Sequence, residues 1–147
     1  MSQDQNMKFS PVKELIEEIR KGHFVIMADD ESRENEGDLV FAAQFVTPEK
    51  INFMMKEARG LICVPLTDKH LFRLGLKDMV KRSEDSMKTA FTISVDARLG
   101  VTTGISAFDR SRTIEVLANP DSKAGDLVAP GHIFRSEEHT SELQSPN

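Results

Sequence analysis

Helix-start motifs and short apolar runs alternate between residues 10 and 134, and this alternation constrains the fold more than any other feature. Ser10-Pro11 predicts the first helix, with the Ser10 hydroxyl as cap and Pro11 at the first helical position. One apolar stripe follows, formed by Val12, Leu15, Ile16 and Ile19. Strands separated by such helices are typical of layered α/β domains. We therefore expect an α/β (α+β) fold, a layered sandwich of a mixed sheet covered by helices.

The remaining elements follow from the same patterns. We expect strands at His23–Ala28 (buried), Leu39–Ala43, Leu61–Leu66 and Ala90–Ala97. Helices are expected from Thr47-Pro48 to Gly60, as a short turn at Leu71–Leu74, and at Asp109–Ala118 before Asn119-Pro120. Small and hydroxyl residues predict a loop at Gly100–Ser106, and an exposed loop is expected at residues 81–88.

Composition narrows the class of protein. The 147 residues suffice for one domain, and no apolar stretch approaches the roughly 18 to 20 residues of a membrane span. A net charge of -5 and the lack of a basic run argue against a nucleic-acid surface. Cys63 is the single cysteine, which excludes an internal disulfide and suits a reducing compartment. With no secretory signal in view, we expect a cytoplasmic protein without membrane or nucleic-acid partners.

The two ends differ from the middle of the chain. Residues 1–9 are expected to be a disordered N-terminus. Residues 135–147, RSEEHTSELQSPN, contain almost no apolar residues and interrupt an apparent strand directly after GHIF. Their sequence resembles a translated sequencing-library adapter. We therefore expect a non-native tail there and leave it out of the fold prediction.

The segment Asp29–Asp38 holds six acidic residues and Arg33. Like charges so close repel one another unless a cation or arginine neutralises them, although most charge-rich loops are solvated turns. An EF-hand calcium loop is excluded, because aligning Gly37 with the invariant glycine puts alanine where a bidentate glutamate is required. Magnesium fits better, since Glu34 and Glu36 point the same way in an extended segment. The residues alone leave a magnesium site and a solvated turn open.

The amino-acid sequence of this loop resembles the signature of a known enzyme family. DDESRENEGDLVF closely resembles the signature of the 3,4-dihydroxy-2-butanone-4-phosphate synthase family, riboflavin-pathway lyases that convert ribulose 5-phosphate to a four-carbon phosphate plus formate. Four further blocks follow in the family's order: GLICVPLT, FTISVDA, GVTTGISAFDRSRTI and DLVAPGHIF. The resemblance covers nearly all of Ser10–Phe134, which we expect to be a partial synthase domain.

The resemblance implies a role for several residues. Arg33 and Asp38 match positions that hold the sugar phosphate, and Glu34 matches a ligand of the catalytic Mg²⁺, with Mn²⁺ as an alternative metal. Glu36 would border the metal and the substrate, and with Asp38 it is a candidate catalytic carboxylate. Thr102 and Thr103 lie in a block that we assign to substrate contact. His132, in the PGH motif, matches a position that is essential for activity. No organic cofactor is implied.

Other functions remain open. The family continues beyond PGHIF with a second metal-ligating histidine and an acidic catalytic residue that this sequence lacks, so we expect the 147-residue chain to be inactive and poorly stable. It is alternatively a non-catalytic metal- or phosphate-binding module, or the N-terminal half of a bifunctional protein with a GTP cyclohydrolase II domain. The resemblance also implies a homodimer for the full-length protein.

Overall fold

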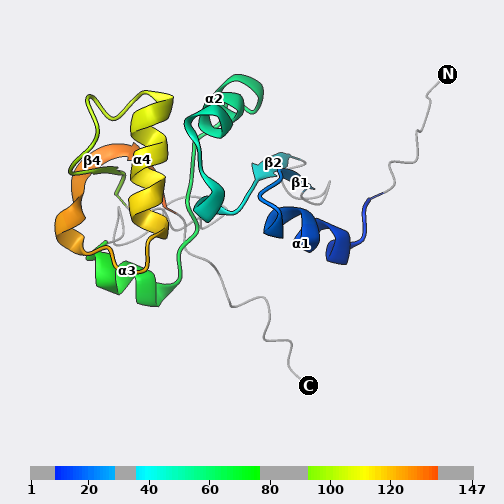
Figure 1. The fold of residues 1–147 in the computed structure, drawn as a ribbon, viewed down its shortest axis with the longest axis horizontal. Helices are drawn as coiled ribbons and strands as arrows, with labels where there is room; N and C mark the ends of the chain where they lie inside the picture. Colours follow the sequence, from blue (N-terminus) through cyan, green and yellow to red (C-terminus); the bar gives the residue numbers. More distant parts are fainter. Residues whose placement is uncertain (1–8, 29–35, 77–92, 136–147) are drawn as a thin grey trace. The chain divides into compact units, whose positions relative to one another are not determined.

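The computed structural model describes residues 9–28, 36–76 and 93–135 (Figure 1). The chain forms two compact units, Met1–Phe45 and Val46–Asn147. Some predictions fall outside the described residues: the N-terminal end up to residue 8, the loop at 81–88, the start of the strand at Ala90–Ala97, and the tail after Arg135.

The first unit contains one helix and a two-stranded sheet. Helix α1 (Val12–Arg20) precedes β1 (Val25–Ala28), which pairs antiparallel with β2 (Gly37–Val40), and a short 3₁₀ turn, η1 (Ala43–Phe45), follows. Phe24 and Phe41, which flank the two strands, stack edge to face with ring centroids 5.0 Å apart. The expected order of helix, strand and strand is confirmed.

Two predicted details of this unit are wrong. Pro11, rather than Ser10, is the N-cap of α1, and no side chain caps the helix. The expected buried strand is buried only at Val25, while Ile26 is 69% and Met27 56% exposed. A run of apolar residues predicts burial on both faces, but β1 pairs with one short strand among the described residues.

The second unit is built around α4 (Ala107–Ala118), which packs on β3 (Val95–Ala97) and β4 (Leu127–Ile133) and against α2 (Pro48–Glu57) (Figure 1). The hydroxyl of Thr113 on α4 accepts a hydrogen bond from the Ala97 amide at 2.9 Å, which fixes the helix to the strand inside the core. The core residues shared by these elements are Ile51, Val95, Ala97, Ile114, Leu117, Leu127 and Ile133.

Capping explains where the helices begin and end. The Thr47 hydroxyl accepts from the Lys50 amide at the start of α2, and the Ser106 hydroxyl accepts from the Asp109 amide at the start of α4. Helix α3 (Asp68–Leu74) ends at Gly75, whose φ of 62° suits glycine, and it packs near the 3₁₀ turn η2 (Ala124–Asp126). The three predicted helices of this unit are confirmed, but α3 begins at Asp68 instead of Leu71 and α4 begins at Ala107 instead of Asp109.

The predicted strand at Leu61–Leu66 is mostly absent. Its pairing with a described segment is a parallel bridge between Cys63 and Phe134, supported by hydrogen bonds from the Val64 amide to the Phe134 carbonyl and from the Phe134 amide to the Ile62 carbonyl. Leu66 is a second isolated bridge residue, and Pro65 before it has no amide proton to donate. Next to this bridge Arg135, the first residue of the expected tail, is buried, with 1% of its surface exposed.

A break in register between β3 and β4 shapes the centre of this unit. Val95 pairs with Ile133, but the next residue, Asp96, pairs with Val128, so residues 129–132 arch over β3. The arch contains the cis peptide bond Ala129-Pro130 and passes very close to the strand at Gly131. A Cβ built on Gly131 would lie 2.1 Å from the Val95 carbonyl carbon and 2.3 Å from the Asp96 amide nitrogen. The arch therefore requires glycine at this position.

Substitution of Gly131 by alanine is expected to destabilise the second unit by about 1–3 kcal/mol, because the new methyl group overlaps backbone atoms that have no freedom to move. Gly125→Ala is the matched control, since a Cβ there meets nothing within 4 Å, and its effect should stay within about 0.5 kcal/mol. Urea unfolding measures both differences. Equal stabilities of the two variants would contradict the close approach.

Candidate active site

The arch brings His132 onto the Asp96 carboxylate. Asp96 Oδ1 accepts from the His132 backbone amide at 2.9 Å, and Asp96 Oδ2 lies 2.8 Å from His132 Nδ1. The Asp96 side chain is 10% exposed, whereas the His132 side chain is 33% exposed. A carboxylate accepts hydrogen bonds, so the Nδ1 proton points at Asp96 and the lone pair of the neutral ring lies on Nε2.

Gly104 covers the other side of this pair. A Cβ at Gly104 would lie 2.0 Å from Asp96 Oδ2 and 2.6 Å from His132 Nδ1, and the φ of Gly104 is +86°. Both the backbone conformation and the close approach require glycine. The loop at Gly100–Ser106, which is confirmed as a loop, therefore presses its backbone directly against the Asp96–His132 pair.

Asp109, in the first turn of α4, holds this loop. Its Oδ1 accepts from the Thr102 amide at 3.0 Å, and its Oδ2 accepts from the Thr102 hydroxyl at 2.8 Å and from the Gly104 amide at 3.0 Å. The Asp109 residue is 4% exposed. The Thr102 amide, followed by the Thr102 hydroxyl and the Gly104 amide, lowers the pKa of the Asp109 carboxyl below its usual range, against an opposing effect of burial.

This lowered pKa predicts a pH dependence of stability. A carboxyl whose pKa is depressed in the folded state stabilises the fold above its unfolded pKa, about 4, and that contribution is lost as the pH falls through the folded pKa. The difference in unfolding free energy between wild type and Asp109→Asn should therefore be constant near neutral pH and shrink below about pH 4. Urea unfolding from pH 3 to 7 measures it, with the exposed Asp121→Asn as control. A difference independent of pH would contradict the assignment.

The two predicted substrate threonines differ in their surroundings. Thr102 donates both its amide and its hydroxyl proton to Asp109, so neither is left for a phosphate oxygen in this arrangement. Both residues are exposed, and the difference between them is the bonding of Thr102 to Asp109. Of the sequence-predicted residues, the second unit thus holds Thr102, Thr103 and His132 around one loop and one arch.

The acidic residues belong to the first unit. Arg33 and Glu34 lie outside the described residues; Glu36 is exposed directly before β2, and Asp38 is exposed within it. Among the residues that the structure describes, no three His, Cys, Asp or Glu side chains form a group that could hold a metal ion. Glu36 presents an exposed carboxylate, and Mg²⁺ is usually bound through one or two carboxylates plus water and substrate oxygens.

Sequence reasoning missed Asp96, Asp109 and Gly104. A carboxylate inside the predicted strand ISVDA was a usable pattern for Asp96, because a buried charge needs partners. Asp109 follows Ser106 by three residues, the spacing of a helix-capping box. Its bonds to Thr102 and Gly104 depend on the loop conformation, which the sequence does not display.

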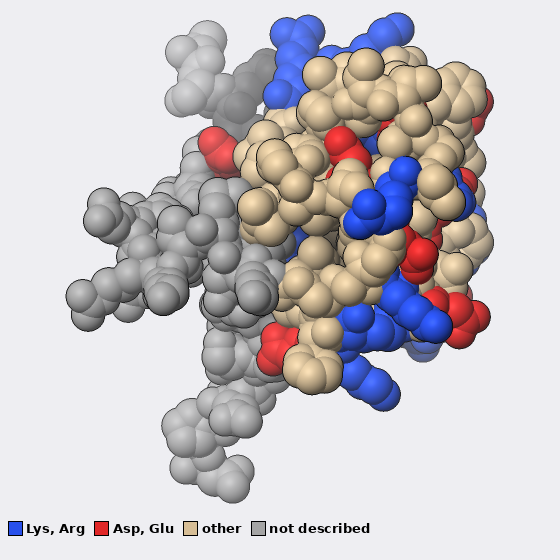
Figure 2. Space-filling model, turned by 90° about the vertical axis from the view of Figure 1, so that its left-hand side faces the viewer, with Lys and Arg blue, Asp and Glu red and all other residues tan. Residues whose placement is uncertain are grey.

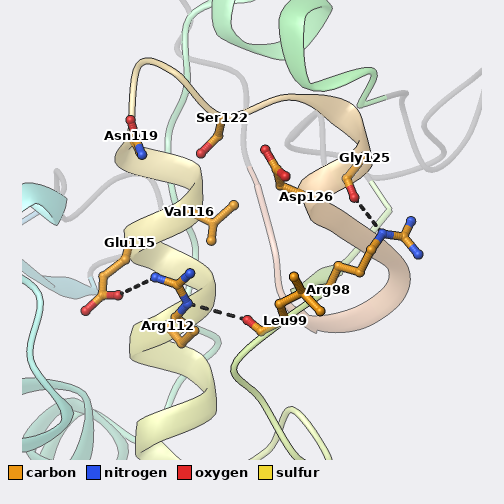
Figure 3. A pocket seen from close by; sticks show the side chains of 9 residues that line it. All are labelled: Arg98, Leu99, Arg112, Glu115, Val116, Asn119, Ser122, Gly125 and Asp126. Carbon is orange, nitrogen blue, oxygen red and sulfur yellow. Dashed lines mark hydrogen bonds and ion pairs between the residues drawn. The ribbon is translucent and has the colours of Figure 1, made fainter.

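A hollow of about 530 Å³ lies at the other end of α4 and is a poor candidate for the site. Its arginines are engaged by the protein: Arg112 bonds to Glu115 and to the Leu99 carbonyl, and Arg98 bonds to the Gly125 and Leu127 carbonyls. Figure 3 shows the Arg98 guanidinium pointing away from α4. The acidic Glu115 and Asp126 also line the hollow, so it offers no strongly cationic surface for a phosphate.

One face of the molecule carries charges of both signs. On the face shown in Figure 2, Lys and Arg side chains alternate with Asp and Glu and with uncharged areas, without one continuous basic patch among the described residues. In the described part of the chain, every helix is too short or too polar to cross a membrane.

Comparisons with known proteins identify the family of the chain. The profile of the family described as 3,4-dihydroxy-2-butanone 4-phosphate synthase matches residues 13–145. The chain is 54% identical to the protein of that name from Pseudomonas aeruginosa, over 87% of this chain and 35% of the relative. It therefore spans about a third of the length of the curated relatives that it matches.

Two solved structures are similar as well. A 3,4-dihydroxy-2-butanone 4-phosphate synthase in complex with two magnesium ions matches with a TM-score of 0.88 at 42% identity, over 90% of this chain and 62% of that one. A two-domain synthase from A. baumannii matches with a TM-score of 0.83 at 45% identity, over 87% of this chain and 38% of that one. The family match covers most of the sequence and the fold agrees, so the chain belongs to the 3,4-dihydroxy-2-butanone 4-phosphate synthase family.

Proposed function

We propose that this chain takes part in the magnesium-dependent conversion of D-ribulose 5-phosphate to 3,4-dihydroxy-2-butanone 4-phosphate plus formate, a step of riboflavin biosynthesis. The observation that carries the proposal is the His132–Asp96 pair closed over by Gly104, in a member of this family. A partly exposed imidazole held by a nearly buried carboxylate is suited to moving protons on a bound sugar.

His132 acts as the proton carrier. Because Nδ1 donates to Asp96, Nε2 is free to take a proton from the carbon beside the substrate ketone and to return it at a later step. Asp96 keeps the ring in this tautomer and stabilises the charged imidazolium that forms. A general base of this kind typically contributes about 10²–10⁴-fold to the rate.

The phosphate and the metal are assigned to the remaining predicted residues. Thr103 and Arg33 bind the phosphate and Asp38 a sugar hydroxyl, whereas Thr102 contributes only when its hydroxyl turns away from Asp109. Glu34 and Glu36 hold Mg²⁺ or, since oxygen ligands suit both ions, Mn²⁺. When bound, the cation supplies Lewis-acid stabilisation of negative charge on the sugar oxygens. Glu36 and Asp38 remain candidates for further proton transfers.

The proposal also covers the sheet architecture and the oligomeric state of the protein. We infer that, in the second unit, the antiparallel pair β3–β4 and the parallel Cys63–Phe134 bridge are parts of one mixed sheet covered by helices. A homodimer is supported by large apolar side chains exposed around the loop that covers the site, namely Leu99, Ile105 and Phe108, since a partner subunit would cover such a surface.

A binding function without turnover is the second candidate. The resemblance implies a second metal-ligating histidine beyond the matched blocks, and the chain covers only 35% of the relative from Pseudomonas aeruginosa. The two-domain synthase from A. baumannii shows that a family member can carry a further domain, which favours the chain being one part of a larger protein.

Product analysis distinguishes turnover from binding. The 147-residue chain is compared with an extended chain, in which the continuation of the Pseudomonas aeruginosa relative follows Phe134. With D-ribulose 5-phosphate and Mg²⁺, nuclear magnetic resonance should detect formate and the four-carbon phosphate from the extended chain, and neither from the aldose ribose 5-phosphate. Binding of ribulose 5-phosphate without formate would support the binding module instead.

A further inference from the structure

Asp109 uses the geometry of a helix cap for a different purpose. Its amide donates to the Ser106 hydroxyl at 3.0 Å, as expected three residues after an N-cap. In a capping box the acidic side chain at this position would return to the backbone amide of the N-cap residue. The Asp109 carboxylate instead accepts from the amides of Thr102 and Gly104 and from the Thr102 hydroxyl. It therefore stabilises the loop ahead of the helix.

The loop transmits this restraint to the Asp96–His132 pair. Asp109 fixes the Gly104 amide at 3.0 Å, and the α-carbon side of Gly104 faces Asp96 so closely that a Cβ would lie 2.0 Å from Asp96 Oδ2. That oxygen is the one that holds His132 Nδ1. A contiguous series of contacts thus runs from Asp109 through Gly104 and Asp96 to the imidazole. The Asp109 carboxylate itself accepts from Thr102 and Gly104 and not from the His132 ring.

We propose that Asp109 is a positioning residue of the active site: through Gly104 it keeps water from the Asp96 carboxylate and so holds His132 in the tautomer with its lone pair on Nε2. The catalytic consequence rests on the proposed function, whereas the effect on the imidazole does not. The hydrogen bonds from Thr102 and from Gly104 to Asp109 then serve the same purpose, which is to hold the loop against Asp96.

Replacement of Asp109 by asparagine tests this, because an amide cannot reproduce the carboxylate. If its oxygen occupies the Oδ2 position, its NH₂ group faces the Thr102 amide; if it occupies Oδ1, the NH₂ group faces the Gly104 amide. In either orientation one backbone donor of the loop loses its acceptor. The loop should loosen, and water should reach Asp96.

The readout is the ring of His132 in the 147-residue chain labelled with ¹⁵N-histidine, with His132→Gln identifying the signals. In wild type, the neutral ring should be protonated almost entirely at Nδ1. Asp109→Asn should raise the share of the Nε2-protonated tautomer several-fold. Ser106→Ala, which removes the cap of the same helix but no acceptor of the loop, should lower stability and leave the tautomer unchanged.

An unchanged His132 spectrum in folded Asp109→Asn would overturn the proposal, and so would an equal change in Ser106→Ala, which would indicate a purely structural role. If circular dichroism shows Asp109→Asn to be unfolded, Thr102→Val replaces it, since it removes one hydrogen bond and keeps both loop amides. A smaller shift in the same direction supports the proposal, and no shift contradicts it.

Kinetics separate this proposal from the proposed function. In the extended chain, Asp109→Asn should lower kcat by about 10–100-fold, the scale of a small misplacement of a catalytic group, with KM changing less. Absence of formate release even in wild type would count against the proposed function, and the tautomer measurement would still decide the role of Asp109.

Discussion

His132→Ala in the extended chain is expected to lower the rate of formate release by about 10²–10⁴-fold, the usual contribution of a general base. The reason is geometric: the arch at residues 129–132 presents one partly exposed imidazole, and its Nδ1 is already committed to Asp96. KM for ribulose 5-phosphate should change much less than kcat, because a proton carrier acts mainly in the transition state. His70→Ala on α3, whose ring lies 2.9 Å from the Thr67 hydroxyl, is the matched control.

Asp96→Asn should also lower the rate of formate release, because it favours the wrong tautomer of the His132 ring. The asparagine oxygen can still accept from the His132 amide, but its NH₂ group then faces Nδ1 and favours the ring protonated at Nε2. Because both residues act as one unit, the double variant should be scarcely slower than His132→Ala alone. Losses that multiply in the double variant would show that the two residues act independently.

Glu34→Gln is expected to remove the activation of formate release by Mg²⁺, with a loss of at least about 10²-fold at moderate Mg²⁺ concentrations. The substitution keeps the shape of the side chain and removes the charge that a hard cation requires. Residue 34 lies outside the described residues, so this prediction rests on the signature that surrounds it. Glu14→Gln on the exposed face of α1 is the control and should leave the Mg²⁺ dependence unchanged. If Glu34→Gln and the wild type showed the same dependence of formate release on Mg²⁺ concentration, Glu34 would be excluded as a ligand.

Local sequence rules predicted most elements of the fold. Thr47-Pro48 predicted the start of α2, because the Thr47 hydroxyl accepts an amide proton that the helix leaves unpaired. The strand at Leu61–Leu66 was overestimated, since the apolar run outweighed the missing donor of Pro65. The burial of β1 was overestimated as well, because burial depends on neighbouring strands that the run itself does not contain.

The candidate site was predicted less completely. The family resemblance of the blocks that contain them indicated His132 and the Thr102–Thr103 pair, because these residue types alone also fit ordinary loop and turn roles. The partner of His132 depends on the register break between Val95 and Asp96, which joins segments 36 residues apart. Long-range pairing of this kind leaves no local pattern, and the closure by Gly104 follows only from the folded backbone.

Chelation of the extended chain tests the central claim most directly. Formate release from D-ribulose 5-phosphate is measured after exhaustive treatment with a chelator and again after Mg²⁺ is restored. We predict that the rate in the wild type falls to background in the chelator and recovers fully with Mg²⁺ or Mn²⁺. In Glu34→Gln the rate should not recover. Undiminished formate release in the chelator would contradict it.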